Sequence, residues 1–154
     1  MTDRDIRQRD ALDRVLALNA LLTEDLARFE AQHGLTGPRV HLLWQLGLAG
    51  PSTQRDLAAA LSVSPRNVTG LVDGLVASGH VTREPHPTDR RATLVTLTGV
   101  GKRFVADLQA SHDDLARQLF GDLPEDRLDS FVEVLDGTLA RVARLMDAHA
   151  GETA

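Results

Sequence analysis

The side chains best suited to chemistry lie in the stretch HPTDRRATLVTLT, where Arg90 and Arg91 directly follow Asp89. An arginine guanidinium is always charged and donates hydrogen bonds in a planar fork, which matches the oxygens of phosphate groups. It is also attracted by the negative potential of a DNA minor groove. Asp89 precedes Arg91 by two residues, so we expect its carboxylate to pair with this arginine and fix its direction. The alternative is a solvated turn whose local ion pair is worth no more than about 1 kcal/mol.

The residues on both sides of these arginines predict a β-hairpin. Residues 81–83 and 93–98 are β-prone, and the segment between them contains Pro85, Pro87 and Asp89, which favour a turn. The two arginines would then project from the tip of the hairpin.

The preceding stretch, STQRDLAAALSVSPRNVTGLVDGLVASGH, predicts two short helices joined by a tight connection. Thr53 followed by Asp56 is similar to a capping box and begins the first helix. Ser64 caps the second helix, and Pro65 takes its first position, where a missing N–H is tolerated. Gly79 ends the second helix in a left-handed conformation.

The second of these helices has an apolar face and a polar face. The inward positions are Val68, Leu71, Val72, Leu75 and Val76. The positions that lie mostly outward are Arg66, Asn67, Thr69, Gly70, Asp73 and Gly74. This arrangement fits a helix-turn-helix whose polar face enters the major groove of DNA. Gly70 and Gly74 each cost about 1 kcal/mol of helix propensity relative to alanine. Close approach to another surface would offset that cost, and for Gly74 we expect internal packing.

Charge is unevenly distributed along the chain, whose net charge is -5. Residues 51–103 carry seven basic and four acidic side chains, a net charge of +3, and the remaining residues carry -8. Because charge acts where it is placed, the middle of the chain is the region that could attract a polyanion. A local excess of three charges also arises by chance, so by itself it leaves a solvated surface open.

Long amphipathic helices are predicted at both ends of the chain. Within residues 6–32, side chains that recur every three or four positions lie along one face of the helix. This stripe is Leu12, Val15, Leu16, Asn19, Leu22, Leu26 and Phe29. Residues 101–120 repeat the pattern, and so does the segment after Asp122, which has Pro124 near its first turn. The stripe of this last segment is Leu128, Phe131, Val132, Leu135, Leu139, Val142 and Met146. A helix of about 25 residues is about 40 Å long, more than a small domain needs to cover its own core. We therefore expect these helices to form a homodimer, with an ordinary amphipathic bundle as the alternative.

Composition excludes several classes of protein. The chain of 154 residues is 42% apolar and 25% charged, and no run approaches the roughly 18 apolar residues that a membrane span needs. It begins with charged residues where a signal peptide would be apolar, so we expect a cytoplasmic protein with no membrane partner. The absence of cysteine excludes disulfides, a thiolate nucleophile and Cys-ligated zinc.

Catalysis and metal binding are not predicted. The sequence has no Gly-x-Ser-x-Gly, phosphate-binding glycine loop or His-Glu-x-x-His motif, so we expect neither an enzyme nor a cofactor. The six histidines have no metal-like spacing, and we predict no metal site. An approach of His41 to His112 that would hold a metal ion stays open.

Taken in order, a long helix, a second helix, the helix-turn-helix, the hairpin and two closing helices resemble the multiple-antibiotic-resistance regulator (MarR) family. The resemblance covers nearly the whole chain. Its most specific part is TREPHPTDRRATLVTLT, which has the family pattern of an Asp, two basic residues and a closing Leu-Thr before a Gly. It implies one MarR-like chain over 1–154 with a mainly α fold and a small β-hairpin wing (α+β). Residues 35–100 would be the winged helix-turn-helix, and residues 1–34 and 101–148 the dimerisation helices.

The resemblance also implies a function and a set of contacts. The protein would be a homodimeric transcription regulator that places each winged helix on half of a near-palindromic site in double-stranded DNA. The residues implied in the major groove are Ser64, Pro65, Arg66, Asn67, Thr69 and Gly70. Arg91 would reach the minor groove, steadied by Asp89, while Arg90 and Arg55 would hold phosphates. We expect a repressor, since a dimer that occupies a promoter blocks polymerase without a further contact surface.

A small-molecule effector that lowers DNA affinity is a further implication of the resemblance. It would bind between the dimer helices and the winged helix, with His41 and Trp44 as candidate contacts on a helix over residues 37–48. The alternative is a satisfied, partly buried His41 with Trp44 in the core. The alternative function is a winged-helix dimer without specific DNA binding that serves as a protein-interaction scaffold.

Overall fold

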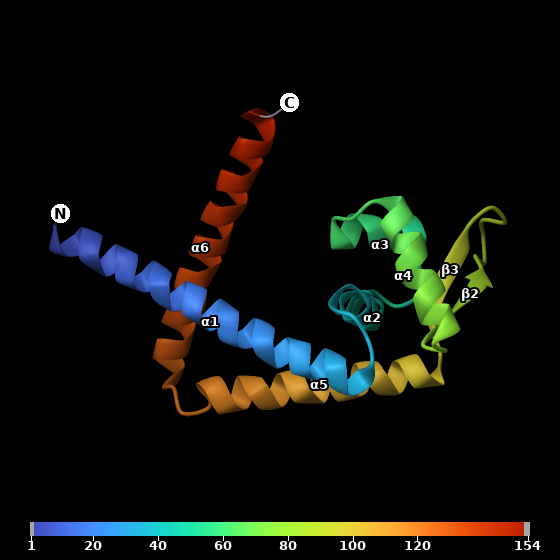
Figure 1. Cartoon of the computed structure of the whole chain (residues 1–154), viewed down its shortest axis with the longest axis horizontal. Coiled ribbons are helices and arrows are strands. Elements are labelled where there is room, and N and C mark those ends of the chain that lie inside the picture. The colour runs from blue at the N-terminus through green and yellow to red at the C-terminus, as the bar shows by residue number, and fades with distance from the viewer. Residues whose placement is uncertain (1, 153–154) are drawn as a thin grey trace. The chain divides into compact units, whose positions relative to one another are not determined.

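Helices dominate the fold, which also contains one small sheet (Figure 1). The computed structural model describes residues 2–152, and over these residues it has six helices and three strands. In chain order the elements are α1 (Asp3–His33), α2 (Gly37–Ala49), β1 (Ser52–Thr53), α3 (Gln54–Leu61), α4 (Pro65–Ala77), β2 (Val81–Pro85), β3 (Thr93–Leu97), α5 (Gly99–Phe120) and α6 (Glu125–Glu152). The predicted fold class, mainly α with a β-hairpin wing, is confirmed. The chain divides into two compact units within α5, the first ending at Leu108 and the second beginning at Gln109.

α1 extends slightly beyond its predicted range because both of its ends are capped. Thr2 Oγ1 accepts a hydrogen bond from the Asp5 N–H at 3.2 Å, and Asp5 Oδ2 accepts one from the Thr2 N–H at 2.7 Å. This reciprocal pair is a capping box, and the hydrogen bonds from Thr2 lower the pKa of the Asp5 carboxyl. Gly34 ends the helix at a φ of +65°, a left-handed conformation that glycine adopts without steric cost.

The core of the first unit is formed by α2, α3, α4, the sheet and the start of α5. Its largest fully buried side chains are Leu42, Leu43, Leu46, Leu57, Leu75, Val40, Val68, Val72 and Val95. Leu26 and Phe29, from the last two turns of α1, pack against this cluster. Because burying a Leu or Val side chain is worth about 1.5–3 kcal/mol, the cluster determines which face of each short helix turns outward.

The sheet is antiparallel, with strand order β1-β3-β2. β2 and β3 form the predicted hairpin, in which Val81 lies opposite Leu97. Ser52 of β1 pairs with Val95 on the other side of β3. The sequence did not predict β1, because two residues are too few to show an alternating pattern.

The ends of the hairpin strands differ from the predicted ones by a few residues. β2 continues to Pro85, two residues beyond the β-prone run, because its pairing with β3 extends that far. Thr98, predicted in the second strand, instead accepts a hydrogen bond from the Gly101 N–H at 3.1 Å through its Oγ1. It therefore caps the start of α5.

The two short helices begin at the predicted caps. Thr53 Oγ1 accepts from the Asp56 N–H at 3.1 Å and starts α3. Ser64 Oγ accepts from the Asn67 N–H at 3.2 Å, and Pro65 is the first residue of α4. The local prediction of a helix-turn-helix is therefore confirmed at both helix starts.

The apolar face of α4 is buried as predicted over most of its length. Val68, Val72 and Leu75 have no exposed surface, and Gly79 follows the helix with a φ of +76°. The prediction for Val76 is wrong, because its side chain is 39% exposed in the last turn, where the helix runs past the core.

The second unit consists of the C-terminal part of α5 and of α6, which are joined by residues 121–124. The rings of Phe120 and Phe131 pack with their centroids 5.8 Å apart. Large apolar side chains of α6 remain exposed, among them Val132, Val134, Leu139, Val142 and Met146. None of the helices within residues 2–152 is long and apolar enough to cross a membrane.

Two glycine-to-alanine substitutions are expected to change stability in opposite directions. A Cβ at the buried Gly101 would overlap the carbonyl oxygen of His80, whereas a Cβ at Gly70 meets nothing within 4 Å. Gly101→Ala should lower the free energy of unfolding by about 1–3 kcal/mol through overpacking. Gly70→Ala should raise it by up to about 1 kcal/mol through helix propensity. Urea titrations followed by circular dichroism measure both values, and a stabilising Gly101→Ala would contradict the packing described here.

Candidate nucleic-acid interface

The outer face of α4 presents short polar side chains to solvent. Arg66, Asn67 and Thr69 are exposed, as are Ser64 and Pro65 at the start of the helix. They point outward because the opposite face of α4 is anchored in the core. Six residues predicted to enter a major groove, these five and Gly70, therefore lie together on one surface of one helix.

The two glycines of α4 have different surroundings. Gly70 borders open space, so its backbone can be approached closely from outside. A Cβ at Gly74 would overlap the guanidinium of Arg39, so Gly74 is packed against its own protein. The prediction of internal packing for Gly74 is confirmed.

The tip of the wing, residues 86–92, is ordered by its own hydrogen bonds. The His86 N–H donates to the Ala92 carbonyl, and the Ala92 N–H donates to the Asp89 carbonyl, both at 3.1 Å. His86 Nδ1 accepts from the Asp89 N–H at 3.1 Å and lies 3.3 Å from the Thr88 N–H. The imidazole therefore organises the turn from inside.

Asp89 acts differently from the prediction. Its Oδ1 accepts from the backbone N–H of Arg91 at 2.9 Å, and within the described part of the chain its carboxylate makes no ion pair with either arginine of the tip. A carboxylate two residues earlier in a turn is placed to reach that N–H, as in an Asx turn. Asp89 consequently fixes the backbone of the tip and leaves the guanidinium of Arg91 unrestrained.

Four arginines of α3, α4 and the wing tip are exposed, and over residues 2–152 their side chains are not engaged by another side chain. They are Arg55 on α3, Arg66 on α4, and Arg90 and Arg91 at the wing tip. An unpaired guanidinium keeps its full capacity to bind phosphate. These four guanidinium groups lie on elements that were predicted to meet DNA.

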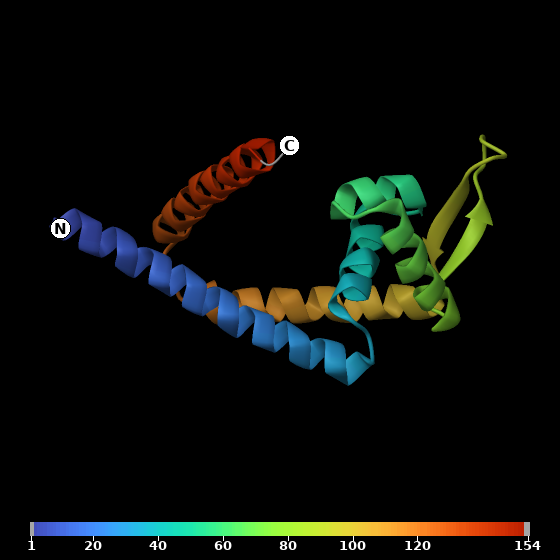
Figure 2. The same ribbon diagram turned by 45° about the horizontal axis from the view of Figure 1, so that its top comes forward.

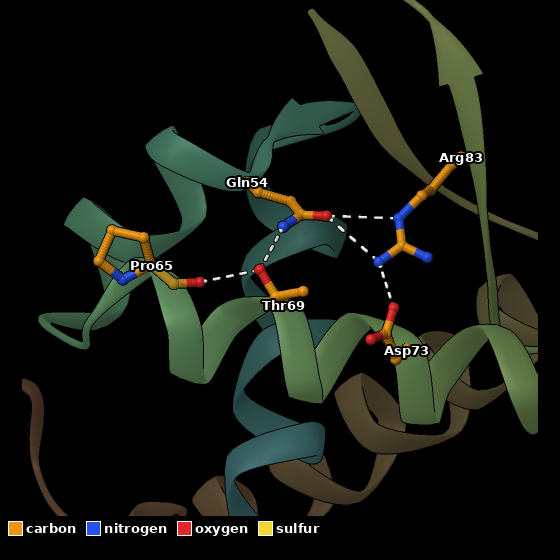
Figure 3. A network of polar contacts seen from close by, with 5 residues as sticks. All are labelled: Gln54, Pro65, Thr69, Asp73 and Arg83. Carbon is orange, nitrogen blue, oxygen red and sulfur yellow. Dashed lines mark hydrogen bonds and ion pairs between the residues drawn. The ribbon is translucent and has the colours of Figure 1, made fainter.

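A polar network that the sequence did not reveal joins the helix-turn-helix to the wing (Figure 3). Gln54 Nε2 donates to Thr69 Oγ1 at 3.0 Å, and Gln54 Oε1 accepts from Arg83 Nε and Nη2 at 3.3 Å each. Arg83 Nη2 also forms an ion pair with Asp73 Oδ1 at 2.6 Å. These residues are 10 to 29 positions apart in the chain, so no local pattern could have predicted their contact.

The network holds α4 and the wing side by side. Figures 1 and 2 show β2 and β3 running alongside α4 and extending beyond it. The outer face of α4 and the arginine-tipped wing thus belong to one surface of the first unit.

His80 lies at the base of the wing, between α4 and β2. Its ring meets Phe104 edge to face with centroids 5.7 Å apart, and its Nδ1 is 2.8 Å from Ser78 Oγ. Burial lowers the pKa of His80 from its ordinary value of 6.5, although a hydrogen bond from the imidazole to the backbone of Ser78 acts in the opposite direction. Folding therefore shifts the protonation equilibrium of His80 toward the neutral imidazole.

The residues predicted to contact an effector lie on α2. His41 is exposed and Trp44 is half-buried, so neither is a fully buried core residue. Among residues 2–152 there is no group of three or more His, Asp or Glu side chains that could hold a metal ion. His41 and His112 belong to different units of the chain.

Comparison with known proteins agrees with this geometry. Residues 33–92, which contain the helix-turn-helix and the wing tip, match the MarR family. The transcriptional activatory protein BadR of Rhodopseudomonas palustris is 38% identical over 101 residues, or 64% of this chain and 57% of BadR. The match thus spans little more than half the length of that relative.

Solved structures extend the similarity to most of the chain. Wild-type MarR of E. coli, in its apo form, is 28% identical with a TM-score of 0.64, covering 83% of this chain and 96% of that protein. The chain is therefore similar to the MarR family in its helix-turn-helix and wing and in its fold. The MarR family regulator SP03579 has the same fold, with a TM-score of 0.82 over 96% of this chain and 97% of that one, at 19% identity. Matching relatives are named as transcription regulators, which agrees with the expectation that this chain is not an enzyme.

Removing the Asp89 carboxylate is expected to loosen the wing tip. In Asp89→Ala the Arg91 N–H loses its acceptor, and since such a bond is worth about 0.5–1.5 kcal/mol, its hydrogen exchange should be about 2- to 13-fold faster. Asp89→Asn retains a side-chain oxygen, so its Arg91 N–H should exchange nearly as slowly as that of the parent. Amide exchange followed by NMR makes the comparison. Equal exchange in the parent and Asp89→Ala would show that this hydrogen bond does not order the tip.

Proposed function

We propose that this protein is a DNA-binding transcription regulator of the MarR family that acts as a homodimer on a near-palindromic site. The observation that carries the proposal is the single surface of the first unit that holds both the polar face of α4 and the arginine-tipped wing. A major groove is about 12 Å wide and admits a helix, while the neighbouring minor groove attracts arginine. One duplex can therefore receive both elements.

The residues proposed for the major groove are those exposed at the start of α4. Ser64, Pro65, Arg66, Asn67, Thr69 and Gly70 are proposed to enter the major groove. An arginine matches the two acceptors of guanine and an asparagine the donor and acceptor of adenine, so Arg66 and Asn67 can distinguish bases. The open space at Gly70 supports close approach of the helix backbone to DNA.

The wing and α3 are proposed to bind groove and backbone. Arg91 enters the minor groove, Arg90 holds a phosphate, and Arg55 contacts a phosphate from α3. Asp89 contributes by ordering the tip through the Arg91 N–H rather than by pairing with a guanidinium.

Residues 1–34 and 101–148 are proposed as the dimerisation helices around a winged helix-turn-helix at 35–100. Support comes from large apolar side chains left in solvent: Leu12 and Leu16 are 58% and 57% exposed on α1, and Leu139 and Met146 are 65% and 68% exposed on α6. Exposed apolar area costs about 25 cal/mol per Å² relative to burial. A second copy of the chain would cover these faces.

Regulation is proposed to be repression in the cytoplasm, since a bound dimer blocks polymerase without a further contact surface. BadR is named an activatory protein. A promoter fused to a reporter gene therefore tests whether this protein represses or activates transcription. An effector near His41 and Trp44 would weaken DNA binding by its different affinity for the two conformations of the dimer, and a coupling of about 1–3 kcal/mol gives about 5- to 150-fold.

The central experiment is a mobility-shift titration on the upstream region of the protein's own gene at several salt concentrations. A specific, salt-sensitive complex is expected. Arg91→Ala should weaken specific binding, and Arg90→Ala should reduce the slope of log K against log salt by about 1 if Arg90 holds one phosphate. Unchanged affinity in Arg91→Ala would remove the wing from the interface. If the parent protein shifts no intergenic palindrome, the protein-interaction scaffold becomes the better interpretation.

The dimer is tested with two substitutions on α6. Leu139 lies on the predicted apolar stripe and Val134 lies off it, yet both side chains are 65% exposed. Leu139→Glu would bury a charge in the proposed interface, so a monomer at micromolar concentration is expected by sedimentation. Val134→Glu is the matched control and should stay dimeric. A parent chain that sediments as a folded monomer would contradict the proposed dimer.

A further inference from the structure

The network of Gln54, Thr69, Asp73 and Arg83 connects three elements of the proposed DNA surface (Figure 3). Gln54 is the first residue of α3, Thr69 and Asp73 are on α4, and Arg83 is on β2. Gln54 uses both ends of its amide, one toward α4 and the other toward β2. Together with the ion pair between Arg83 and Asp73, these bonds close a ring through α4.

The hydroxyl of Thr69 is already occupied. Its O–H donates to the Pro65 carbonyl at 3.0 Å, and its oxygen accepts from Gln54 Nε2 at 3.0 Å. A hydroxyl has one proton to donate, so Thr69 could donate to a base only by giving up its bond to Pro65. The neighbouring Arg66 and Asn67 carry no such restriction, because among the described residues their side chains have no hydrogen-bond partner.

The carboxylate of Asp73 lies one helical turn beyond Thr69 and is 61% exposed. An unpaired negative charge at this position would repel DNA phosphates. Arg83, whose side chain is only 33% exposed, neutralises it and is itself directed toward α4 and α3 instead of outward. The four arginines with free guanidinium groups are therefore better placed for phosphate than Arg83.

From these contacts we propose that Gln54, Thr69, Asp73 and Arg83 form a brace that fixes the position of the wing relative to α4. Thr69 and Arg83 are thus positioning residues, whereas Arg66 and Asn67 read the bases. The inference rests on the proposed function, because its purpose is to match the wing and α4 to adjacent grooves of one duplex. A preset spacing lets the second element bind without a further loss of conformational freedom.

Free protein tests the brace without DNA. The chain has no cysteine, so spin labels can be attached at Asn67→Cys and Pro87→Cys, with the labelled protein diluted in unlabelled protein. The distance distribution between the labels should be narrow in this parent and broader when Arg83→Gln is added. Arg28→Gln, which removes an exposed ion pair with Glu24 at 2.8 Å on α1, should leave the width unchanged.

Binding measurements test the consequence for DNA. Arg83→Gln should weaken specific binding about tenfold, the factor that corresponds to about 1.4 kcal/mol. Its hydroxyl-radical footprint should lose the protection due to the wing and keep the protection due to α4. The thermal midpoint should change little, because exposed ion pairs contribute little to stability. If Arg83→Gln does not fold, Asp73→Asn carries the same test.

A double-mutant cycle separates positioning from direct reading at Thr69. If Thr69 acts through Gln54, Thr69→Val and Gln54→Leu should each weaken binding, and the double variant should be no weaker than the stronger single variant. If Thr69 contacts DNA itself, the two effects should add. Additive effects on binding, together with a label-distance distribution that is no broader in Arg83→Gln than in the parent, would overturn the brace. A parent that forms no salt-sensitive complex would overturn the proposed function instead, while the label distances would still decide on the brace.

Discussion

The structure depends on the burial of one face of α4. Val68, Val72 and Leu75 have no exposed surface, and they belong to one buried cluster with side chains from α2, α3 and the sheet. Because a helix has one orientation in which these three side chains are inside, the opposite face is fixed without any polar contact. Arg66, Asn67 and Gly70 are outward for the same reason that the three apolar residues are inward.

The sheet gives the wing a similar foundation. Val81 and Val95 are buried at the base of the hairpin, whereas residues 83–85 of β2 are exposed. β1 lies on the far side of β3 and is followed directly by α3, so the same three strands hold the wing and the start of the helix-turn-helix. Gln54, immediately after β1, is therefore close to Arg83 although 29 residues separate them.

Local chemistry was readable from the sequence, and distant contacts were not. Helix starts at Thr53 and Ser64, the left-handed end at Gly79, and the hairpin each depend on residues that are neighbours in the chain. The two-residue strand β1 and the exposure of Val76 depend instead on where neighbouring elements end. The role of Asp89 was missed for a subtler reason: its carboxylate had a nearer partner in the backbone than the expected guanidinium.

The self-contained order of the wing tip has an evolutionary consequence. The hydrogen bonds described for residues 86–92 begin and end within the tip, and none of its residues belongs to the buried core. Changes there alter neither the packing of the helices nor the pairing at the base of the strands. The residues of the tip can thus change over evolution while the scaffold beneath them stays constant.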